Sequence, residues 1–289
     1  GAEIAPRASA APPAALTSKA LGVERGRLLP DVPPANVHWV CDAEGIARCR
    51  EAVLGESRNP TTLEGYPAVV GLDGEWKPGN NTPVSILQVA TRSEVFVLDL
   101  LAMAPSASPA CDALDEFLGD MLQSQRVYKL GFSFAYDLTR MKASYPHLRC
   151  LRASPVVAAL VDVKELAHAA SANRMNLRIG LATLTKFVVG AVLSKEQQCS
   201  DWSRRPLAAA QLAYAAADAF YLCLIFDKCV AKSNGKLLAQ LVDIAELGDP
   251  RVKGKHLPRK AKKAVKKQME LAAKALERAS QYAAGGGVL

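Results

Sequence analysis

Two acidic residues, Asp73 and Glu75, stand two positions apart at the end of an apolar run, residues 69–76 (VVGLDGEW). Alternate residues of a strand face the same side of a sheet, so both carboxylates point the same way. Gly74 points to the opposite face, where it leaves room for close packing by another element. Taken alone, the pair is either the polar end of a strand or one half of a metal site.

Two further aspartates follow later in the chain. Asp137 lies six residues after Gly131, which ends a predicted strand, and it stands near the start of a predicted helix. Asp218 lies within the apolar helical sequence QLAYAAADAFYL, and Tyr214 shares its helix face one turn earlier. Burying an aspartate is costly unless it is paired or coordinates a cation. Asp218 is therefore either bonded to a nearby arginine or part of a metal site.

Together these residues have the composition of a site for two divalent cations. Such a site needs several hard oxygen ligands, and carboxylates from separate elements supply them. The four histidines and seven cysteines of the sequence form no clustered ligand pattern, which argues against zinc. Magnesium or manganese is the ion type that this set of oxygen ligands favours.

The elements that would position these residues alternate between strands and helices. Three strands with short polar separators predict an antiparallel meander, and the later strands alternate with helices, so a mixed sheet with helices packed on it is expected. Asp42 is the predicted N-cap of the first helix, and Gly190 ends a later one. The predicted strands are residues 36–41, 67–76, 83–91, 93–100, 126–132 and 155–163, and the predicted helices are residues 42–55, 110–123, 134–145, 164–171, 177–190 and 207–232.

Composition sets the broad class of the protein. The 289 residues are 50% hydrophobic, which is enough for one large α/β core with appendages. The net charge of +8 favours a polyanionic partner such as nucleic acid. No run of about 18 uncharged apolar residues occurs, so no membrane span is predicted. The scattered cysteines predict reduced thiols and an intracellular location.

Three segments differ in composition. Residues 1–35 are predicted to be an Ala/Pro-rich arm or linker, or alternatively the remains of a targeting region for a mitochondrion or plastid. If they are not a targeting region, the expected location of the protein is the nucleus or the cytoplasm. Residues 36–248 are the predicted folded domain, which contains the four carboxylates. Residues 249–289 are a Lys/Arg-rich, partly helical tail that includes Lys260, Lys262 and Lys263. This tail is either a solvated segment or a phosphate-binding arm with salt-dependent affinity.

The segments VVGLDGEW, KLGFSFAYDL and YAAAD resemble the three exonuclease motifs of the DEDD superfamily, in the subgroup with a tyrosine in the third motif. The flanking sequences SILQVA, VFVLDLL and SDWSRRPL are similar to those of RNase D and Nibbler-type exonucleases, and resemble the Werner type less. This resemblance covers about residues 36–230. It implies an α/β RNase H-like exonuclease fold, with a mixed central sheet flanked by helices, and a 3′–5′ exonuclease that uses two divalent cations, Mg²⁺ or Mn²⁺.

The resemblance also implies a role for each motif residue. Asp73 would bind both cations, Glu75 and Asp218 would complete the first site, and Asp137 would hold the second. Tyr214 would orient the attacking water. The implied reaction is hydrolysis of the terminal phosphodiester at a single-stranded 3′ end, with release of nucleoside 5′-monophosphates. RNA is favoured over DNA because the sequence is closer to the RNase D and Nibbler types.

Further residues are assigned by their positions beside the motifs. Trp76, Phe132 and Phe134 are candidates for stacking on a terminal base, with core packing as the alternative for each of the two phenylalanines. Arg204 and Arg205 either contact phosphates or brace the loop before the last helix. Lys129, which alternates with apolar residues, is interpreted as a charge on a sheet edge.

A second hypothesis is a non-catalytic nucleic-acid-binding or structural subunit of a ribonucleoprotein assembly. The basic tail and the Ala/Pro arm motivate it. The presence of all four carboxylates and the tyrosine counts against it. Asp99, in VFVLDLL, is expected to be structural.

Overall fold

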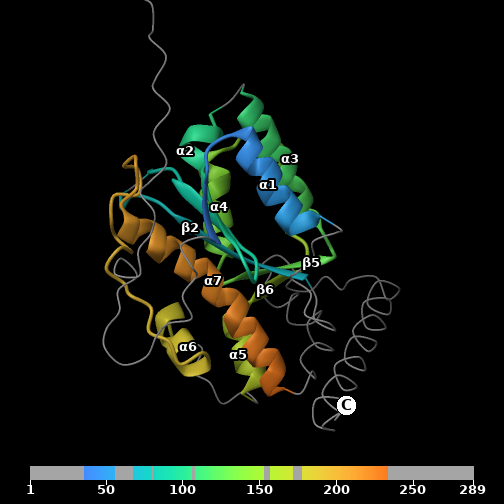
Figure 1. Ribbon diagram of the computed structural model, residues 1–289, viewed down its shortest axis with the longest axis vertical. Coiled ribbons are helices and arrows are strands. Elements are labelled where there is room, and N and C mark those ends of the chain that lie inside the picture. The colour runs from blue at the N-terminus through green and yellow to red at the C-terminus, as the bar shows by residue number, and fades with distance from the viewer. Residues whose placement is uncertain are drawn as a thin grey trace, which may run out of the picture.

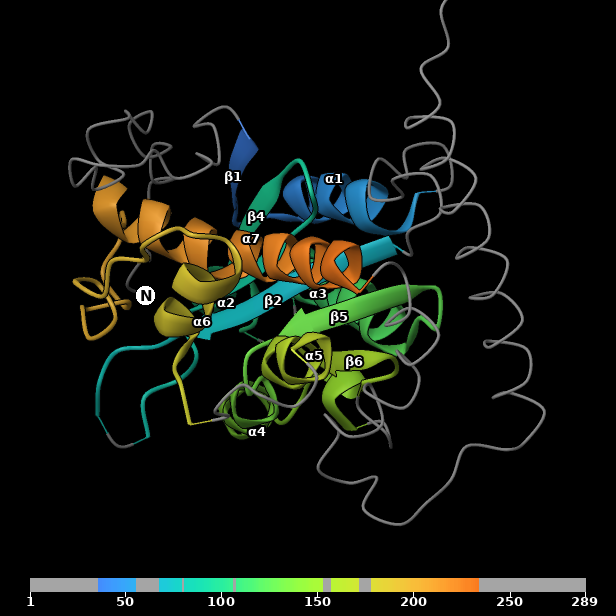
Figure 2. The same ribbon diagram turned by 90° about the horizontal axis from the view of Figure 1, so that it is seen from below.

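A computed structural model describes residues 36–55, 68–79, 81–105, 108–152, 157–171 and 178–233 of the chain. They form a mixed six-stranded sheet with helices on both faces (Figures 1 and 2). The predicted arm, residues 1–35, and the predicted tail, residues 249–289, lie outside the described residues.

The sheet contains the predicted antiparallel meander, β2–β3–β4, at its centre. Strands β1, β5 and β6 add to it in parallel, giving the order β1-β4-β3-β2-β5-β6. Their bounds are β1 Val37–Val40, β2 Ala68–Glu75, β3 Ile86–Ala90, β4 Val95–Asp99, β5 Val127–Gly131 and β6 Leu160–Asp162. The prediction of a mixed sheet is confirmed, although β6 is shorter than the predicted strand over residues 155–163.

The helices follow the predicted order along the chain, with one short helix, α2, that was not predicted. They are α1 Ala43–Leu54, α2 Leu100–Met103, α3 Pro109–Gln123, α4 Ala135–Ser144, α5 Val163–Ala170, α6 Leu181–Val188 and α7 Ala209–Lys232. Asp42 caps α1 as predicted, since its side chain accepts a hydrogen bond from the Gly45 N–H at 2.8 Å. Gly190, with φ of +81°, follows the end of α6 in a conformation that favours glycine.

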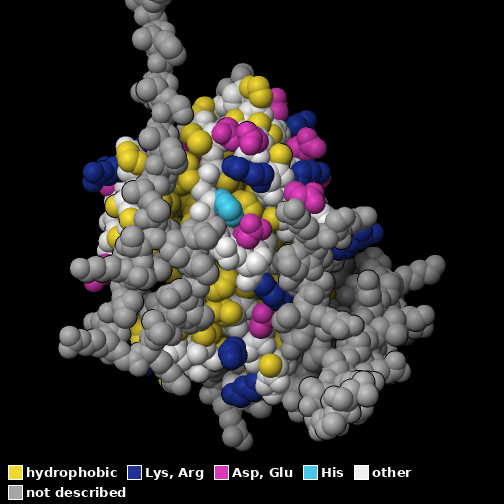
Figure 3. All heavy atoms as spheres, in the orientation of Figure 1, with side chains coloured by type: hydrophobic (Ala, Val, Ile, Leu, Met, Phe, Trp, Pro, Cys, Tyr) yellow, Lys and Arg dark blue, Asp and Glu magenta, His cyan; other side chains and the backbone are white. Residues whose placement is uncertain are grey.

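The two faces of the sheet have separate helical covers. One buried apolar cluster joins the sheet to α1, α3 and α4, and the clusters on the other face join it to α5, α6 and α7. Helix α7 runs across β2, β3 and β4 (Figure 2). On the face shown in Figure 3, acidic and basic side chains are interspersed around α1 and α3 and form no patch of one sign. The excess positive charge is therefore not concentrated at this part of the surface.

A glycine in β2 sets the distance between α7 and the sheet. A Cβ atom on Gly71 would lie only 2.1 Å from the carbonyl oxygen of Ala219, so the helix backbone rests directly on the strand. The α7 residues that face this contact are small, and Ala215, Ala216 and Ala219 are all buried. This close approach brings the part of α7 that precedes the contact beside the carboxyl end of β2.

Helix α7 is also, within the described residues, the one helix long and apolar enough to cross a membrane by length and composition. Its apolar window is 67% buried inside the fold, where it packs against the sheet. A buried core helix passes the same test of length and hydropathy, so this feature carries no argument for a membrane.

Lys129 has a different environment from the one predicted. Strand β5 lies between β2 and β6, and Lys129 is fully buried there. Its ammonium donates hydrogen bonds to the carbonyl oxygens of Ser124, at 2.6 Å, and Val127, at 2.8 Å. Burial lowers the pKa of Lys129 to about 7. The interpretation as an edge charge was wrong, because sequence alternation does not show which strands lie at the edge.

All seven cysteines are free thiols, as predicted.

Candidate metal centre and nucleic-acid cleft

Three of the predicted carboxylates meet at the end of β2. Asp73, Glu75 and Asp218 each offer a carboxylate oxygen, and these atoms lie within 4.8 Å of one another. Asp73 and Glu75 share the strand face that α7 covers, and Asp218 lies one residue before the close contact between Ala219 and Gly71. The cluster therefore follows directly from the alternation of β2 and the small residues that let α7 approach it.

Asp137 reaches the same end of β2 from the other side of the strand. It lies in the first turn of α4, and a Cβ atom on Gly74 would be 3.2 Å from its Oδ1 atom. The Gly74 N–H also donates a hydrogen bond to the Asp137 carboxyl. The room predicted at Gly74 is thus filled by Asp137, which stands outside the three-oxygen cluster but lines the same cleft.

The carboxyl groups of the cluster are electrostatically uncompensated. Burial raises the pKa of Asp137 and of Asp218 to about 7, although a hydrogen bond from Tyr214 opposes the shift at Asp218. Burial and then the charges of Asp218 and Asp137 raise the pKa of Glu75 to about 9. Burial and the three neighbouring carboxylates raise the pKa of Asp73 well above its usual range. A bound divalent cation would supply the missing positive charge, and hard carboxylate oxygens suit Mg²⁺ or Mn²⁺.

Tyr214 lies at the cleft one turn before Asp218. Burial, then the charges of Asp218 and Glu75, and then the hydrogen bond with Asp218 raise the pKa of the tyrosine hydroxyl well above its usual value. The fully buried ring of Trp202 packs against it, with centroids 5.9 Å apart and an interplanar angle of 44°. The phenol is therefore protonated at neutral pH and has a fixed position.

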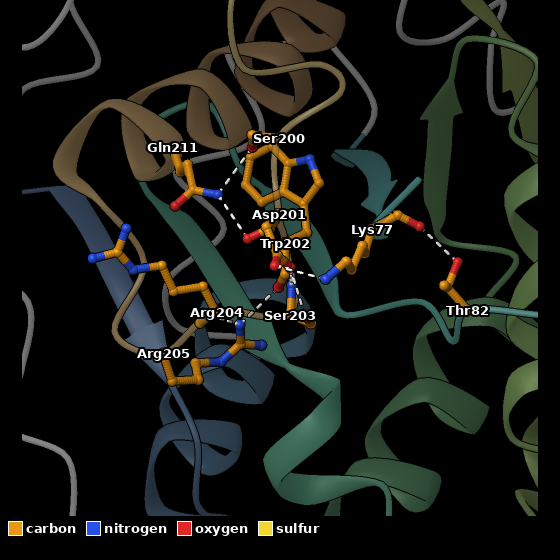
Figure 4. Close-up of polar contacts among 9 residues, drawn as sticks. All are labelled: Lys77, Thr82, Ser200, Asp201, Trp202, Ser203, Arg204, Arg205 and Gln211. Carbon is orange, nitrogen blue, oxygen red and sulfur yellow. Dashed lines mark hydrogen bonds and ion pairs between the residues drawn. The ribbon is translucent and has the colours of Figure 1, made fainter. Parts of the chain in front are cut away.

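The loop that carries Trp202 is held by polar contacts from both sides (Figure 4). The Lys77 ammonium donates to the Asp201 carboxylate at 2.8 Å, which links this loop to the segment just after β2. The Gln211 amide of α7 donates to the Ser200 hydroxyl at 2.9 Å and to the Asp201 carbonyl oxygen at 3.1 Å. The loop thus joins the strand that carries Asp73 to the helix that carries Asp218.

The two adjacent arginines of this loop differ in their surroundings. The Arg205 guanidinium donates to both carboxylate oxygens of Asp99, with Nε at 2.7 Å from Oδ2, and to the Trp202 carbonyl oxygen at 2.8 Å. It also lies 5.1 Å from the ring centroid of Trp39. Of the two alternatives predicted for Arg205, these contacts support bracing of the loop, and its contact with phosphate stays a prediction. Arg204 is exposed but does not line the cleft, so its phosphate contact stays a prediction.

A cleft of about 470 Å³ opens beside the carboxylates. Trp76 and Phe132 line it, in agreement with their predicted proximity to the motifs. The Arg140 guanidinium lies 4.7 Å above the Trp76 ring, and the Lys164 ammonium lies 5.4 Å above the Phe132 ring. Both rings are therefore at the cleft with a cation nearby, and stacking on a base stays a prediction for each.

Part of the cleft lining comes from a loop whose residues 195–199 were assigned no role from the sequence. Lys195, Gln198 and Cys199, in the polar loop between α6 and α7, line the cleft together with the first residues of α6. Lys195 is the one basic side chain among the lining residues in the described part of the chain. No spacing rule links this loop to the carboxylate motifs. The predicted contacts of Lys260, Lys262 and Lys263 fall outside the described residues.

Comparison with known families fits the site that the carboxylates form. A model of the 3′–5′ exonuclease family matches residues 51–232, which is well over half of the chain. The chain belongs to this 3′–5′ exonuclease family, whose members act on nucleic acid with divalent metal ions. It is thus an exonuclease by family.

Individual proteins with similar sequences include exonucleases and a ribonuclease. The chain is 32% identical over 213 residues to the human protein "Exonuclease mut-7 homolog", a match that covers 66% of this chain and 22% of the relative. It is 31% identical over 167 residues to ribonuclease D of Gluconacetobacter diazotrophicus, covering 57% of this chain and 38% of that protein. The chain therefore spans well under half the length of these relatives.

Solved structures show the same fold. The Aedes aegypti Nibbler EXO domain has a TM-score of 0.60 at 23% identity, and the match covers 75% of this chain and 100% of that domain. Escherichia coli RNase D has a TM-score of 0.56 at 20% identity, covering 76% of this chain and 52% of that protein. The mixed six-stranded sheet with flanking helices is the RNase H-like exonuclease fold, as predicted.

Proposed function

We propose that this protein removes nucleotides from the 3′ end of single-stranded RNA, in preference to DNA, and releases nucleoside 5′-monophosphates with two bound Mg²⁺ or Mn²⁺ ions. The observation that carries the proposal is the carboxylate cluster, in which oxygens of Asp73, Glu75 and Asp218 lie within 4.8 Å of one another. Asp137 lines the same cleft and provides a ligand for a second ion. No basic side chain competes for these carboxylates among the described contacts.

Each residue of the site has a separate task in this proposal. Asp73, Glu75 and Asp218 would hold one cation, and Asp73 with Asp137 would hold the other. Such ions would supply positive charge to stabilise the charge that develops on the terminal phosphodiester. Tyr214 presents a protonated hydroxyl beside Asp218 and orients the water for attack. Its contact with Trp202 keeps that hydroxyl in place.

The substrate lies in the cleft beside this site. Trp76 and Phe132 stack on bases at the 3′ end, since both rings line the cleft. Lys195 offers a positive charge to a backbone phosphate from the loop that lines the cleft. The preference for RNA is supported by the similarity to proteins named ribonuclease D, one of which is described as an exoribonuclease involved in structured RNA processing.

Regions outside the described residues extend this proposal. We infer a domain over residues 36–248 and a basic tail over residues 249–289 that binds phosphates. Removing the tail is expected to weaken RNA binding and to flatten its salt dependence, because fewer counterions are then released. An unchanged salt slope would refute the role of the tail.

The proposal is tested with 5′-labelled single strands of RNA and DNA of one sequence, incubated with Mg²⁺, Mn²⁺ or EDTA. We expect a ladder that shortens from the 3′ end, faster on RNA, only when a cation is present. A DNA ladder as fast as the RNA ladder would contradict the sugar preference. Binding without any product, with either ion and either strand, would contradict catalysis and favour the non-catalytic ribonucleoprotein subunit.

A further inference from the structure

Gln88, at the centre of β3, is fully buried, and neither its Oε1 nor its Nε2 atom has a hydrogen-bond partner among the described residues. Buried amide groups are nearly always hydrogen-bonded, because an unpaired one keeps the full cost of leaving water. A residue with this cost at the centre of a sheet is expected to have a role beyond packing.

The sheet register places one polar side chain beside Gln88. Gln88 is directly opposite Asp73 on β2 and opposite Val97 on β4, and opposite residues of antiparallel strands share a face. The other residues on this face of β3, Ile86 and Ala90, pack with Val97 in the apolar cluster under α7. Asp73 is therefore the polar side chain directly opposite Gln88, and its carboxylate is within reach of the amide because opposed Cβ atoms are about 5 Å apart.

We propose that Gln88 is a positioning residue for Asp73, donating an Nε2–H hydrogen bond to the Asp73 carboxylate when the cations are bound. The inference rests on the divalent-cation site of the proposed function. Carboxylates that bind metals are themselves hydrogen-bonded by surrounding residues, which fix the direction of their oxygens. Asp73 most needs such support, because it is the ligand that both cations would share.

This role predicts effects of opposite sign in the free and the cation-bound protein. In Gln88→Met, an unbranched apolar side chain of similar length replaces the unpaired amide. Without cations, the melting temperature should equal or exceed that of the wild type, because the unpaired polar group is gone. The affinity for Mn²⁺ should fall about tenfold. This value is the lower limit of the roughly 10–100-fold loss that follows removal of a hydrogen bond to a metal ligand.

Val97→Ala is the matched control. Val97 flanks Gln88 on the side away from Asp73, and its truncation removes packing from the same apolar cluster. This variant should melt at a lower temperature than the wild type, because it leaves a cavity. Its Mn²⁺ affinity should be unchanged, because no group beside Asp73 is altered.

The experiment is a calorimetric Mn²⁺ titration of the full-length wild type, Gln88→Met and Val97→Ala, with melting temperatures measured in EDTA. A loss of Mn²⁺ affinity in Gln88→Met, well beyond any loss in Val97→Ala, is the expected result. Equal affinities in these two variants would overturn the role of Gln88. The readout does not depend on nuclease activity, so an inactive wild type that still binds Mn²⁺ would contradict the proposed function alone. A wild type that binds no Mn²⁺ would overturn both.

Discussion

The ends of β2 and β4 both carry buried acidic residues, yet their surroundings differ in one respect. At the end of β4, Asp99 accepts hydrogen bonds from the Arg205 guanidinium and from the Ala102 N–H at 3.3 Å, where it caps α2. At the end of β2, Asp73 and Glu75 face further carboxylates and have no basic partner within the described residues. The two strand ends look alike in the sequence. The proposed metal ligands at β2 thus differ from the structural carboxylate of Asp99 in having no compensating charge among the described residues.

Neutralising one carboxylate at each strand end should give the largest contrast. Asp73→Asn removes the ligand that both cations would share, and nuclease activity should fall at least 100-fold. Loss of a residue that only supports a metal ligand typically lowers activity by about 10–100-fold, so the loss of a ligand should be larger. Asp99→Asn should keep nuclease activity within about tenfold at a temperature where the variant is folded. Both are measured as initial rates of RNA shortening. Equal losses in the two variants would remove the distinction between the strand ends.

Breaking the compensated pair should lower stability. Arg205→Ala leaves the Asp99 carboxylate buried without its partner, and the side chain of Asp99 is only 6% exposed. Removing one member of a buried pair typically costs about 3–5 kcal/mol in the free energy of unfolding. Urea denaturation measures this cost. The neighbouring exposed Arg204→Ala is the control, with an expected change within about 0.5 kcal/mol. A similar small change in Arg205→Ala would show that Asp99 does not depend on it.

The uncompensated cluster should make the cation-free protein sensitive to pH. In the folded chain the pKa values are raised to about 7 for Asp137 and Asp218, and to about 9 for Glu75, above those of the unfolded chain near 4. Between these limits the folded state holds more protons than the unfolded state. The free energy of unfolding should therefore fall as pH rises from about 4 to about 7. Above pH 7 the lowered pKa of Lys129 opposes any further fall.

Urea denaturation in EDTA across this pH range measures the fall. Asp218→Asn should reduce it, because one of the raised groups no longer ionises. Adding Mn²⁺ to the wild type should restore stability at the higher pH values, because a ligand that binds only the folded state stabilises it. Stability in EDTA that stayed constant or rose over this range would contradict the like-charge cluster.

The smallest expected effect concerns the loop that lines the cleft. Lys195→Gln should weaken the binding of single-stranded RNA a few-fold. The slope of the logarithm of the binding constant against the logarithm of the salt concentration should decrease in magnitude by about 0.7, the value for one phosphate contact on a single strand. Binding is measured in the Asp218→Asn background, where the RNA is not degraded. Lys186→Gln, at an exposed position of α6 outside the cleft lining, should leave the slope unchanged. Identical slopes for both variants would exclude the Lys195 contact.

The parts of this structure that depend on local pattern could be predicted from the sequence. Strand alternation placed Asp73 and Glu75 on one face, and the room left by Gly74 is occupied by Asp137. Apolar periodicity gave the order of the helices and strands, because neighbouring residues in the chain set it. The family resemblance, and not spacing alone, brought Asp137 and Asp218 to one site.

What could not be predicted depends on contacts between distant segments. Arg205 meets Asp99 across 106 positions, so nothing local distinguishes it from the exposed Arg204. Lys129 is buried because β5 is an inner strand, and strand order is a tertiary property. Lys195 lines the cleft because the loop that precedes α7 lies beside the cleft. These positions follow from how the strands and helices assemble, which a single sequence does not state.

The central claim, that the end of β2 is a divalent-cation centre for nucleotide removal, is tested most directly by mononucleotide release. A 3′-labelled single-stranded RNA is incubated with the wild type and with Asp218→Asn, in Mg²⁺, in Mn²⁺ and in EDTA. The account predicts labelled nucleoside 5′-monophosphate from the wild type with at least one cation, and none in EDTA or from Asp218→Asn. Release that persists in EDTA, or is equal in Asp218→Asn, would contradict it.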